Sequence, residues 1–292
     1  MSYRTRFAPS PTGPLHLGHA YSAWIGATRA KAQGGDFLVR IEDLDTSRAR
    51  PEWEAQIHED LAWMEIAYPV PVLRQSERGA AYDRALAQLW EMGLLYPCTC
   101  KRRDIEAAVA APQEGEAVHG PDGLVYPGTC RAVPSGPMPP GVALRLDMAR
   151  AMQRVGPADW AETGAGPNGE TGHIAISRPR MLAEVGDVAV RRPAMGAAYH
   201  LAVVVDDADQ AITEVVRGED LFDATAIHIV LQRLLGLPSP RYHHHSLIRD
   251  EAGKRLAKRD DARAIATYRA QGMSPEDLRR RVGLAEDSTR HP

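Results

Sequence analysis

The stretch from Arg6 to His19, RFAPSPTGPLHLGH, restricts the fold more than any other part of the chain. A short strand is predicted at 4–7, and the three prolines and one glycine that follow exclude regular structure and force a turn. Apolar residues then recur at helical spacing from Leu15 to Ala30, with no proline inside. A strand, a turn and a helix start form an anion cradle, because the first helical turn has unpaired N–H groups and a partial positive charge.

His16 and His19 stand three residues apart in this stretch, so a helix places them on one face. Gly18 lies between them and lets another backbone or a flat ring approach closely. This arrangement indicates the binding and neutralisation of a polyphosphate. By itself the pattern is weak evidence, since two histidines near a helix start are usually surface polar groups.

Acidic residues follow the next predicted strand. The run 36–41, DFLVRI, is short and apolar, and it delivers Glu42, Asp43 and Asp45 at its carboxyl end. Ligands of parallel α/β sheets bind beyond the carboxyl ends of the strands. The acids therefore mark a candidate binding edge, and the alternative is a solvated acidic loop.

Two further strands are predicted in the second half of the chain. Tyr199 begins YHLAVVVDD, a continuous apolar run expected of a strand buried on both faces, which ends at 206–207 in two aspartates. The run 212–216 predicts another strand, with Arg217 at its end. A guanidinium there suits a carboxylate, because its planar fork can donate two parallel hydrogen bonds. The alternative is a surface salt bridge with an acid of the RGED sequence.

All three cysteines, Cys98, Cys100 and Cys130, lie in one small region. Cysteines one residue apart do not easily form a disulfide with each other, whereas their thiolates can share a metal. The third cysteine predicts a zinc site that lacks one ligand, and on general grounds imidazole makes His119 the first candidate. An odd number of cysteines also argues against the disulfide framework of a secreted protein. The alternative is three reduced thiols without a metal.

The charge balance excludes a strongly basic protein, because 35 Lys and Arg against 38 Asp and Glu give a net charge of −3 over 292 residues. A nucleic-acid partner therefore needs a local basic patch, for which 101–103 and 279–281 are candidates. No apolar run follows Met1, and none approaches the roughly 20 residues that cross a bilayer, so we expect a cytoplasmic protein without a signal peptide. The absence of a coiled-coil pattern fits a monomer.

The stretch RFAPSPTGPLHLGH is similar to the first signature of class I glutamyl-tRNA synthetases, usually HIGH and here HLGH. The resemblance extends from Arg4 to about Arg259. The second signature, KMSKS, is matched by Arg255-Leu-Ala-Lys-Arg259, in which Arg255 keeps a positive charge and Ala257 loses the hydroxyl of a serine. The resemblance implies three catalytic residues, His16, His19 and Lys258, and five that bind ATP, His16, Gly18, His19, Arg255 and Lys258.

The same resemblance implies a glutamate site. IEDLD is similar to the IEDTD segment of the family, whose glutamate meets the amino group of the substrate, and this implies that role for Glu42. RGED and YHLA resemble family segments that help hold the amino acid, which implicates Arg217 and Tyr199. Arg6 and Ser10 also resemble family residues that contact glutamate. Two arginines and one glutamate make chemical sense for a substrate with two carboxylates and one ammonium.

The cysteine region resembles a zinc knot of the family, with the pattern CTC…YxxxC. In that knot a tyrosine oxygen is the fourth ligand. The resemblance therefore implies one structural Zn²⁺ held by Cys98, Cys100, Tyr126 and Cys130. We prefer this set to one that includes His119.

The implied fold is α/β, that of a class I synthetase with a Rossmann-like parallel sheet. The two halves of this sheet are expected at 1–96 and 196–262, separated by an inserted α+β, zinc-bearing domain at 97–195. A short helical segment is expected at 263–292, with Ser274 as an N-cap before Pro275. It leaves no room for an anticodon-binding domain.

These features together resemble the truncated paralogues of the family, the glutamyl-Q tRNA(Asp) synthetases. The resemblance implies activation of L-glutamate by ATP with Mg²⁺, through glutamyl-adenylate, and transfer to the queuosine base at the wobble position of tRNA(Asp). One alternative is a truncated glutamyl-tRNA synthetase that charges the 3′ end of tRNA, and another is a catalytically silent tRNA-binding paralogue. A nucleotidyltransferase with an HxGH loop is disfavoured by RIEDLD, RGED and the cysteine pattern.

Overall fold

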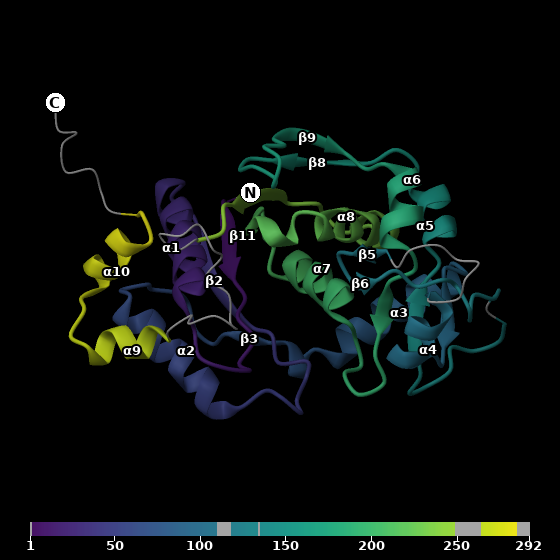
Figure 1. Ribbon diagram of the computed structural model, residues 1–292, viewed down its shortest axis with the longest axis horizontal. Helices are drawn as coiled ribbons and strands as arrows, with labels where there is room; N and C mark the ends of the chain where they lie inside the picture. The colour runs from purple at the N-terminus through teal and green to yellow at the C-terminus, as the bar shows by residue number, and fades with distance from the viewer. Residues whose placement is uncertain (1, 110–117, 134, 249–263, 285–292) are drawn as a thin grey trace.

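The computed structural model describes residues 2–109, 118–133, 135–248 and 264–284 (Figure 1). Its strands are β1 (Arg4–Phe7), β2 (Asp36–Ile41), β3 (Leu73–Arg74), β4 (Leu95–Cys98), β5 (His119–Gly120), β6 (Gly123–Leu124), β7 (Ala143–Leu146), β8 (Asp159–Glu162), β9 (Gly172–Ala175), β10 (Ala189–Arg191), β11 (Glu214–Gly218) and β12 (Arg241–His245). Its α-helices are α1 (Leu17–Ala32), α2 (Pro51–Trp63), α3 (Gly79–Glu91), α4 (Arg102–Val109), α5 (Met148–Val155), α6 (Arg178–Arg180), α7 (Tyr199–Asp209), α8 (Ala224–Leu235), α9 (Ile265–Ala270) and α10 (Pro275–Arg281). Three short turns complete them, the 3₁₀ turns η1 (Gln75–Glu77) and η3 (Glu219–Leu221) and the π-helical turn η2 (Met181–Val185).

The parallel strands of the fold come from both the first and the second half of the chain. Strands β1, β2 and β3 pair in parallel, and so do β11, β12 and β8, while β9 is antiparallel to β8. The two groups meet where β1 and β11 begin, since the Arg4 N–H donates to Thr213 Oγ1 (2.8 Å) and the Thr213 N–H donates to the Arg4 carbonyl (2.9 Å). The predicted α/β fold with a parallel sheet is confirmed.

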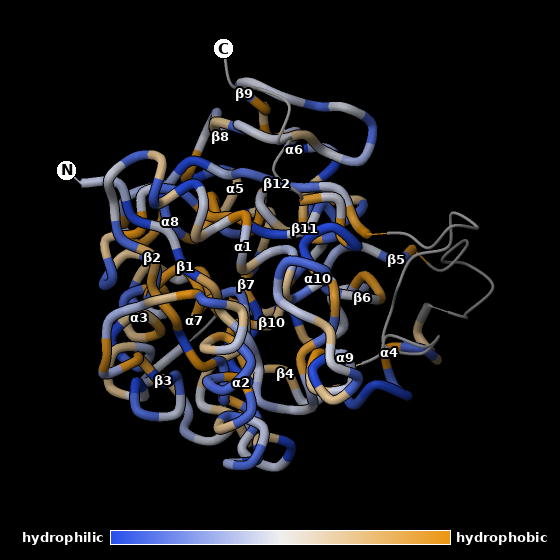
Figure 2. The backbone as a smooth tube through the Cα atoms, turned by 90° about the vertical axis from the view of Figure 1, so that its left-hand side faces the viewer, coloured by the Kyte–Doolittle hydropathy of each residue, from blue (hydrophilic) through white to orange (hydrophobic). Residues whose placement is uncertain are grey.

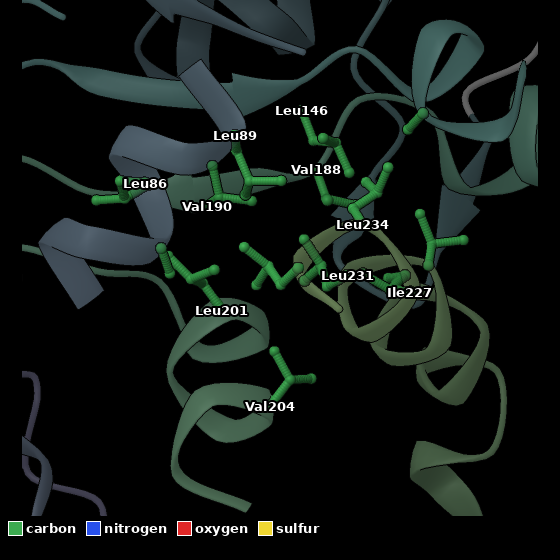
Figure 3. Packing of buried hydrophobic residues seen from close by; sticks show 14 of the residues in the cluster. Leu86, Leu89, Leu146, Val188, Val190, Leu201, Val204, Ile227, Leu231 and Leu234 are labelled. Atoms are coloured by element: carbon green, nitrogen blue, oxygen red, sulfur yellow. The ribbon is translucent and has the colours of Figure 1, made fainter. Parts of the chain in front are cut away.

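A second sheet, with the strand order β10-β7-β4, is antiparallel and lies against α3, α5, α7 and α8. Leucine, valine and isoleucine side chains from these helices and strands converge in its core (Figure 3). Leu201 and Leu231 are fully buried there, one from α7 and one from α8. This core fixes α7 and α8, and α7 in turn reaches the parallel sheet.

Helices α9 and α10 pack beside α1 and α2, at the left of Figure 1 and facing the viewer in Figure 2. Ile265 and Leu278 are fully buried in one core with Trp24 and Leu61. The predicted N-cap is present, because Ser274 and Asp277 form a reciprocal capping box. Within the described ranges, no helix has the length and apolar character needed to cross a membrane.

The strand predicted for YHLAVVVDD is wrong, since Tyr199–Asp209 is the helix α7. A short, wholly apolar run does not distinguish a buried strand from a buried helix, because neither shows a polar face. Here the helix packs against α3 and α8, and every residue from His200 to Asp207 is buried. The two aspartates therefore lie in the last turns of a helix and not at a strand end.

One carboxylate in this core has no hydrogen-bond partner among the described residues. Asp60 of α2 is fully buried, and both of its oxygens lack a donor. The nearest cation is Arg269 of α9, whose Nη1 lies 3.6 Å from Asp60 Oδ1. Burial raises the pKa of Asp60 to about 6, against the attraction of Arg269 and together with the repulsion of Glu59. The charged carboxylate of Asp60 thus lowers the free energy of unfolding where α9 packs against α2.

Asp60→Asn is therefore expected to stabilise the protein at high pH and not at low pH. A carboxyl whose folded pKa is about 6 binds its proton more tightly in the folded state than in the unfolded one, so stability falls as the pH rises from 3.8 through 6. Thermal unfolding followed at about pH 4 and about pH 8 tests this, with Glu52→Gln, at an exposed position of the same helix, as the control. An equal gain at both pH values would contradict a charge-based origin.

Candidate active site

A cavity of about 640 Å³ lies at the carboxyl edge of the parallel sheet. It is bounded by the turn after β1, the start of α1, the end of β11 and the start of α7. All eight described residues for which the sequence predicts a role with ATP or glutamate line it: Arg6, Ser10, His16, Gly18, His19, Glu42, Tyr199 and Arg217. The remaining two, Arg255 and Lys258, lie outside the described residues.

The start of α1 is closed by the two histidines of HLGH. His16 is the N-cap, and its Nδ1 accepts the Gly18 N–H (3.2 Å), while His19 Nδ1 accepts the His16 N–H (3.2 Å). The rings stack with their centroids 3.8 Å apart. A neutral histidine that accepts at Nδ1 carries its hydrogen on Nε2. Both rings are thereby fixed as Nε2–H donors beside a helix N-terminus, which suits a phosphate.

A buried ion network underlies the opposite wall. Arg6 donates two hydrogen bonds to Asp207, from Nε to Oδ1 (2.9 Å) and from Nη2 to Oδ2 (3.2 Å). Arg40 donates from Nη1 to the same Oδ1 (2.7 Å) and from Nη2 to Glu42 Oε1 (3.3 Å). The side chain of Arg40 is fully buried, and that of Asp207 is 5% exposed. Strands β1 and β2 are thus tied to the end of α7 by charge.

These contacts set the protonation of the acids. Burial opposes the charge of Asp207, but Arg6 and Arg40 outweigh it and hold the pKa of this carboxyl below its usual value. Burial raises the pKa of Glu42 above its usual value, although Arg40 and Arg6 oppose this. A substrate ammonium beside Glu42 would offset the loss of water around that carboxylate. Glu42 therefore has the electrostatics expected of an amine receptor.

Arg217 is buried, and its side chain is largely committed to internal partners. Its Nε donates to His244 Nε2 (3.1 Å), its Nη1 to His228 Nδ1 (3.2 Å), and its Nη2 to both Thr225 Oγ1 (2.7 Å) and the Leu221 carbonyl (3.0 Å). A guanidinium has five N–H groups. One N–H, on Nη1, therefore remains after the contacts within the described chain. In this arrangement Arg217 therefore cannot donate the two parallel hydrogen bonds to a substrate carboxylate that the sequence predicted.

Tyr199 begins α7 and places its ring at the cavity wall, edge-on to His200 and His228. Burial raises the pKa of its phenol, which therefore remains an O–H donor at neutral pH. Ser10 lies in the turn after β1 and is exposed at the rim. These two residues add neutral polar groups to a cavity whose charged lining residues are Arg6, Glu42, Arg217 and Asp220.

Several residues that hold the cavity walls in place without lining the cavity were not predicted from the sequence. Arg40 is one, and the signal was a charged residue inside the apolar run DFLVRI. His228 and His244 are two others, both almost fully buried. Internal histidines in HHH and in an apolar helix are a signal for buried hydrogen bonds, but their partners come from distant parts of the chain.

A second cavity, of about 540 Å³, lies on the other side of η3. Asp220 of this turn lines both cavities. The second cavity is bounded by the β8–β9 hairpin, the turn at α6 and the start of α8. Its ionisable lining is mostly acidic, with Glu170, Glu184, Asp220 and Asp223 against Arg180 and His119. Arg180 pairs with two of these acids, Glu184 and Asp223.

The three cysteine sulfurs lie within 4.8 Å of one another, as a metal site requires. The hydroxyl of Tyr126 lies among them, 3.5 Å from Cys98 Sγ and 3.4 Å from Cys100 Sγ, and it accepts the Cys130 N–H (2.7 Å). His119 is exposed on β5 and, among the described residues, does not belong to this cluster. The three cysteine sulfurs and the Tyr126 oxygen could together ligate a metal ion that binds sulfur.

The local electrostatics favour a thiolate in this cluster. Burial opposes the charge on Cys130, but hydrogen bonds from the Tyr126 hydroxyl and the Thr99 backbone outweigh it and lower the pKa of this thiol to about 6. The guanidinium of Arg145 also lies over the ring of Tyr126, 3.9 Å from its centroid. Deprotonated sulfur is the form that binds a metal.

Comparison with known proteins gives three kinds of match. The model of the family "tRNA synthetases class I (E and Q), catalytic domain" matches residues 2–122 and 171–289. The glutamyl-Q tRNA(Asp) synthetase of Rhodobacter capsulatus is 57% identical over 284 residues, which are 96% of this chain and 99% of that protein. The glutamyl-Q tRNA(Asp) synthetase of Albidiferax ferrireducens is 40% identical over 271 residues, 91% of this chain and 87% of that protein.

A solved structure is also similar, the crystal structure of a glutamate tRNA ligase from Elizabethkingia meningosepticum in complex with its amino acid. The TM-score is 0.73 and the sequence identity is 27%. The match covers 94% of this chain and 59% of that one. This chain therefore spans about three fifths of the length of that solved ligase.

Asp207→Ala is expected to lower the free energy of unfolding by about 3 to 5 kcal/mol, because Arg6 and Arg40 would stay buried without their shared counter-charge. Urea unfolding at neutral pH measures this. The control is Asp209→Ala, which removes an exposed carboxylate paired with Arg78 and should cost about 1 kcal/mol or less.

The contribution of Asp207 also has a defined pH dependence. Because its folded pKa lies below 3.8, the stabilisation is complete above that pH and is lost as the pH falls through the folded value. Equal losses for the two variants at neutral pH would show that the buried network does not stabilise the fold.

Proposed function

The chain belongs to the class I tRNA synthetases of the glutamate and glutamine group, and within them to the glutamyl-Q tRNA(Asp) synthetases, and from this premise we propose its reaction. The enzyme activates L-glutamate with ATP and Mg²⁺ and transfers it to the queuosine base at the wobble position of tRNA(Asp). It acts as a monomer in the cytoplasm. One observation carries the proposal: a single cavity joins the helix-capping histidine pair to two buried arginines and to Glu42, whose side chain is 11% exposed.

The charges of the cavity match the charges of glutamate. Arg6 and Arg217 supply two cations for two carboxylates, and Glu42 supplies one anion for the ammonium. Arg6 keeps N–H groups beyond the two that Asp207 accepts, and Arg217 keeps one. Tyr199 and Ser10 add hydroxyls to the same wall and rim. The set favours an amino acid with an acidic side chain over one with a neutral side chain.

The start of α1 is the proposed phosphate site. His16 and His19 would donate from Nε2 to ATP oxygens, and Gly18 leaves room for the nucleotide beside the helix start. Arg255 and Lys258, outside the described residues, are assigned to the same phosphates from the KMSKS-like signature. Mg²⁺ bound to ATP would neutralise part of the phosphate charge.

In the first step an α-carboxylate oxygen of glutamate attacks the α-phosphorus of ATP. A new C–O–P bond forms, and pyrophosphate leaves. In the second step a hydroxyl of the queuosine cyclopentene ring attacks the carbonyl carbon of glutamyl-adenylate, AMP leaves, and the hydroxyl proton is released. No covalent enzyme intermediate is required, so the protein positions the reactants and stabilises charge.

The second cavity supports the transfer step. It adjoins the first across η3, so an acceptor base within it could present a hydroxyl to the adenylate. Its acidic lining would repel a phosphate and suits the secondary amine of the queuosine base, which is protonated at neutral pH. This makes it our proposed approach for the acceptor.

Transfer of labelled glutamate to two purified tRNAs tests the function. We expect label on tRNA(Asp) that carries queuosine, and we expect that label to survive removal of the 3′-terminal nucleoside. Queuosine-free tRNA(Asp) is the matched control and should stay unlabelled.

Two other results would contradict the proposal. Label on tRNA(Glu) that is lost with the 3′ end would identify an enzyme that charges tRNA. Absence of label on either tRNA, together with no glutamate-dependent pyrophosphate exchange, would identify a silent tRNA-binding paralogue.

We further propose that the cysteine cluster, within an inserted domain at 97–195, holds one structural zinc ion. The three sulfurs and the Tyr126 oxygen supply the four ligands of a tetrahedral site. The zinc would tie β4 to the segment around Cys130 and would take no part in the chemical steps.

Metal analysis of the purified protein is expected to give one zinc per chain. Cys100→Ser should abolish retention of zinc during dialysis against a chelator. Tyr126→Phe should weaken retention, whereas His119→Ala should leave it unchanged, because His119 lies outside the cluster. Loss of zinc in His119→Ala with full retention in Tyr126→Phe would reverse the assignment of the fourth ligand.

A further inference from the structure

Two chains of buried hydrogen bonds start at Arg217 and end at carboxylates. The first runs from Arg217 through His244 to Glu162, and the second runs through His228 and His200 to Asp122. His200, His228 and His244 are each exposed by 4% or less. None of these histidines lines the cavity, so the first chain reaches the substrate site only through Arg217, and the second reaches it through Arg217 and the ring of Tyr199.

The direction of the first chain follows from proton counting. Arg217 is always protonated and has only donors, so His244 Nε2 must accept its Nε–H. His244 must then carry its hydrogen on Nδ1, which lies 2.6 Å from Glu162 Oε2. Glu162 also accepts the backbone N–H groups of His244 and Gly164, both at 2.9 Å. The carboxylate is thereby anchored, and it fixes the ring.

The second chain has the opposite tautomer. His228 Nδ1 accepts from Arg217 Nη1, so His228 carries its hydrogen on Nε2 and donates to His200 Nδ1 (3.1 Å). His200 in turn carries its hydrogen on Nε2, which lies 3.5 Å from Asp122 Oδ1. Each of the two histidines thus accepts at Nδ1 and carries its hydrogen on Nε2, the nitrogen that faces the next partner.

We propose that His228 and His244 are positioning residues that hold the guanidinium of Arg217 in one orientation, with a single N–H left for a substrate carboxylate. This inference rests on the proposed function, in which Arg217 binds glutamate. Thr225 Oγ1, which also lies 3.3 Å from His244 Nε2, and the Leu221 carbonyl accept from Nη2 of Arg217. The arginine is therefore oriented before the substrate arrives, and binding does not have to restrict its side chain.

The surroundings keep both rings neutral. Burial, followed by the charge of Arg217, lowers the pKa of His228 well below its usual value. Burial also lowers the pKa of His244, although the hydrogen bond to Glu162 opposes this. A protonated ring at either place would turn an acceptor into a donor that faces the guanidinium. Neutral imidazoles are thus required by the geometry and favoured by the environment.

The tautomers can be read directly by NMR on the full chain labelled with ¹⁵N-histidine. At about neutral pH we expect His244 as the Nδ1–H form, which is the less common tautomer of free histidine, and His228 and His200 as Nε2–H forms. Variants that remove one ring at a time assign the signals. An imidazolium or an Nε2–H form at His244 would overturn the proposal.

Glutamate-dependent pyrophosphate exchange provides the kinetic test. His228→Leu removes the acceptor and should raise the glutamate KM about tenfold, with little change in the KM for ATP. His228→Asn places an amide oxygen near the Nδ1 position and should recover most of that loss. His173→Leu is the matched control, because His173 is exposed on β9, and it should behave as the unmodified protein.

The outcomes separate this inference from the function on which it rests. If the unmodified protein shows no glutamate-dependent exchange, the proposed function fails, and the NMR tautomers still decide the hydrogen-bond chains. If exchange is present and His228→Leu leaves the glutamate KM unchanged, the positioning role is refuted. Should His228→Leu not fold, Thr225→Val removes another acceptor of Arg217 with little change in shape, and the same increase in KM is expected or the proposal fails.

Discussion

The buried carboxylate of Asp207 joins the two parts of this molecule, because it pairs with Arg6 of β1 and Arg40 of β2 while it belongs to α7. Helix α7 is held on its apolar side by the core that Figure 3 shows. The ion network therefore connects that core to the parallel sheet and determines where the cavity walls stand. An interaction of this kind is strong only when every partner is present, since removing one leaves a charge buried without compensation.

The chemistry of the cavity depends on groups that do not line it. Arg6 is oriented by Asp207, and Arg217 by His228 and His244. Each cation is thus held in a fixed position by partners away from water, where hydrogen bonds are electrostatically stronger. The histidine pair at the start of α1 follows the same rule, because each ring is oriented by a backbone N–H. The result is a site whose donors are arranged before a ligand is present.

Much of this arrangement could be predicted from the sequence. The turn and helix start at HLGH, the strand that carries Glu42, the strand that ends at Arg217 and the cysteine cluster were all identified from local patterns. Helix α7 was not, because its apolar run lacks the polar face that distinguishes a helix from a buried strand. The cavity nevertheless contains Tyr199, because helix α7 begins at the cavity wall.

The sequence by itself indicated which residues meet at the cavity, through local patterns at HLGH and the strand ends and through the resemblance to glutamyl-tRNA synthetases for Arg6, Ser10 and Tyr199. It also determined the α/β class and the parallel sheet. Only the tertiary structure decided how those residues are held: the pairing of Asp207 with two strands, and the one N–H of Arg217 that no described residue accepts. These contacts join residues far apart in the chain, and long-range packing, which no local pattern encodes, brings them together.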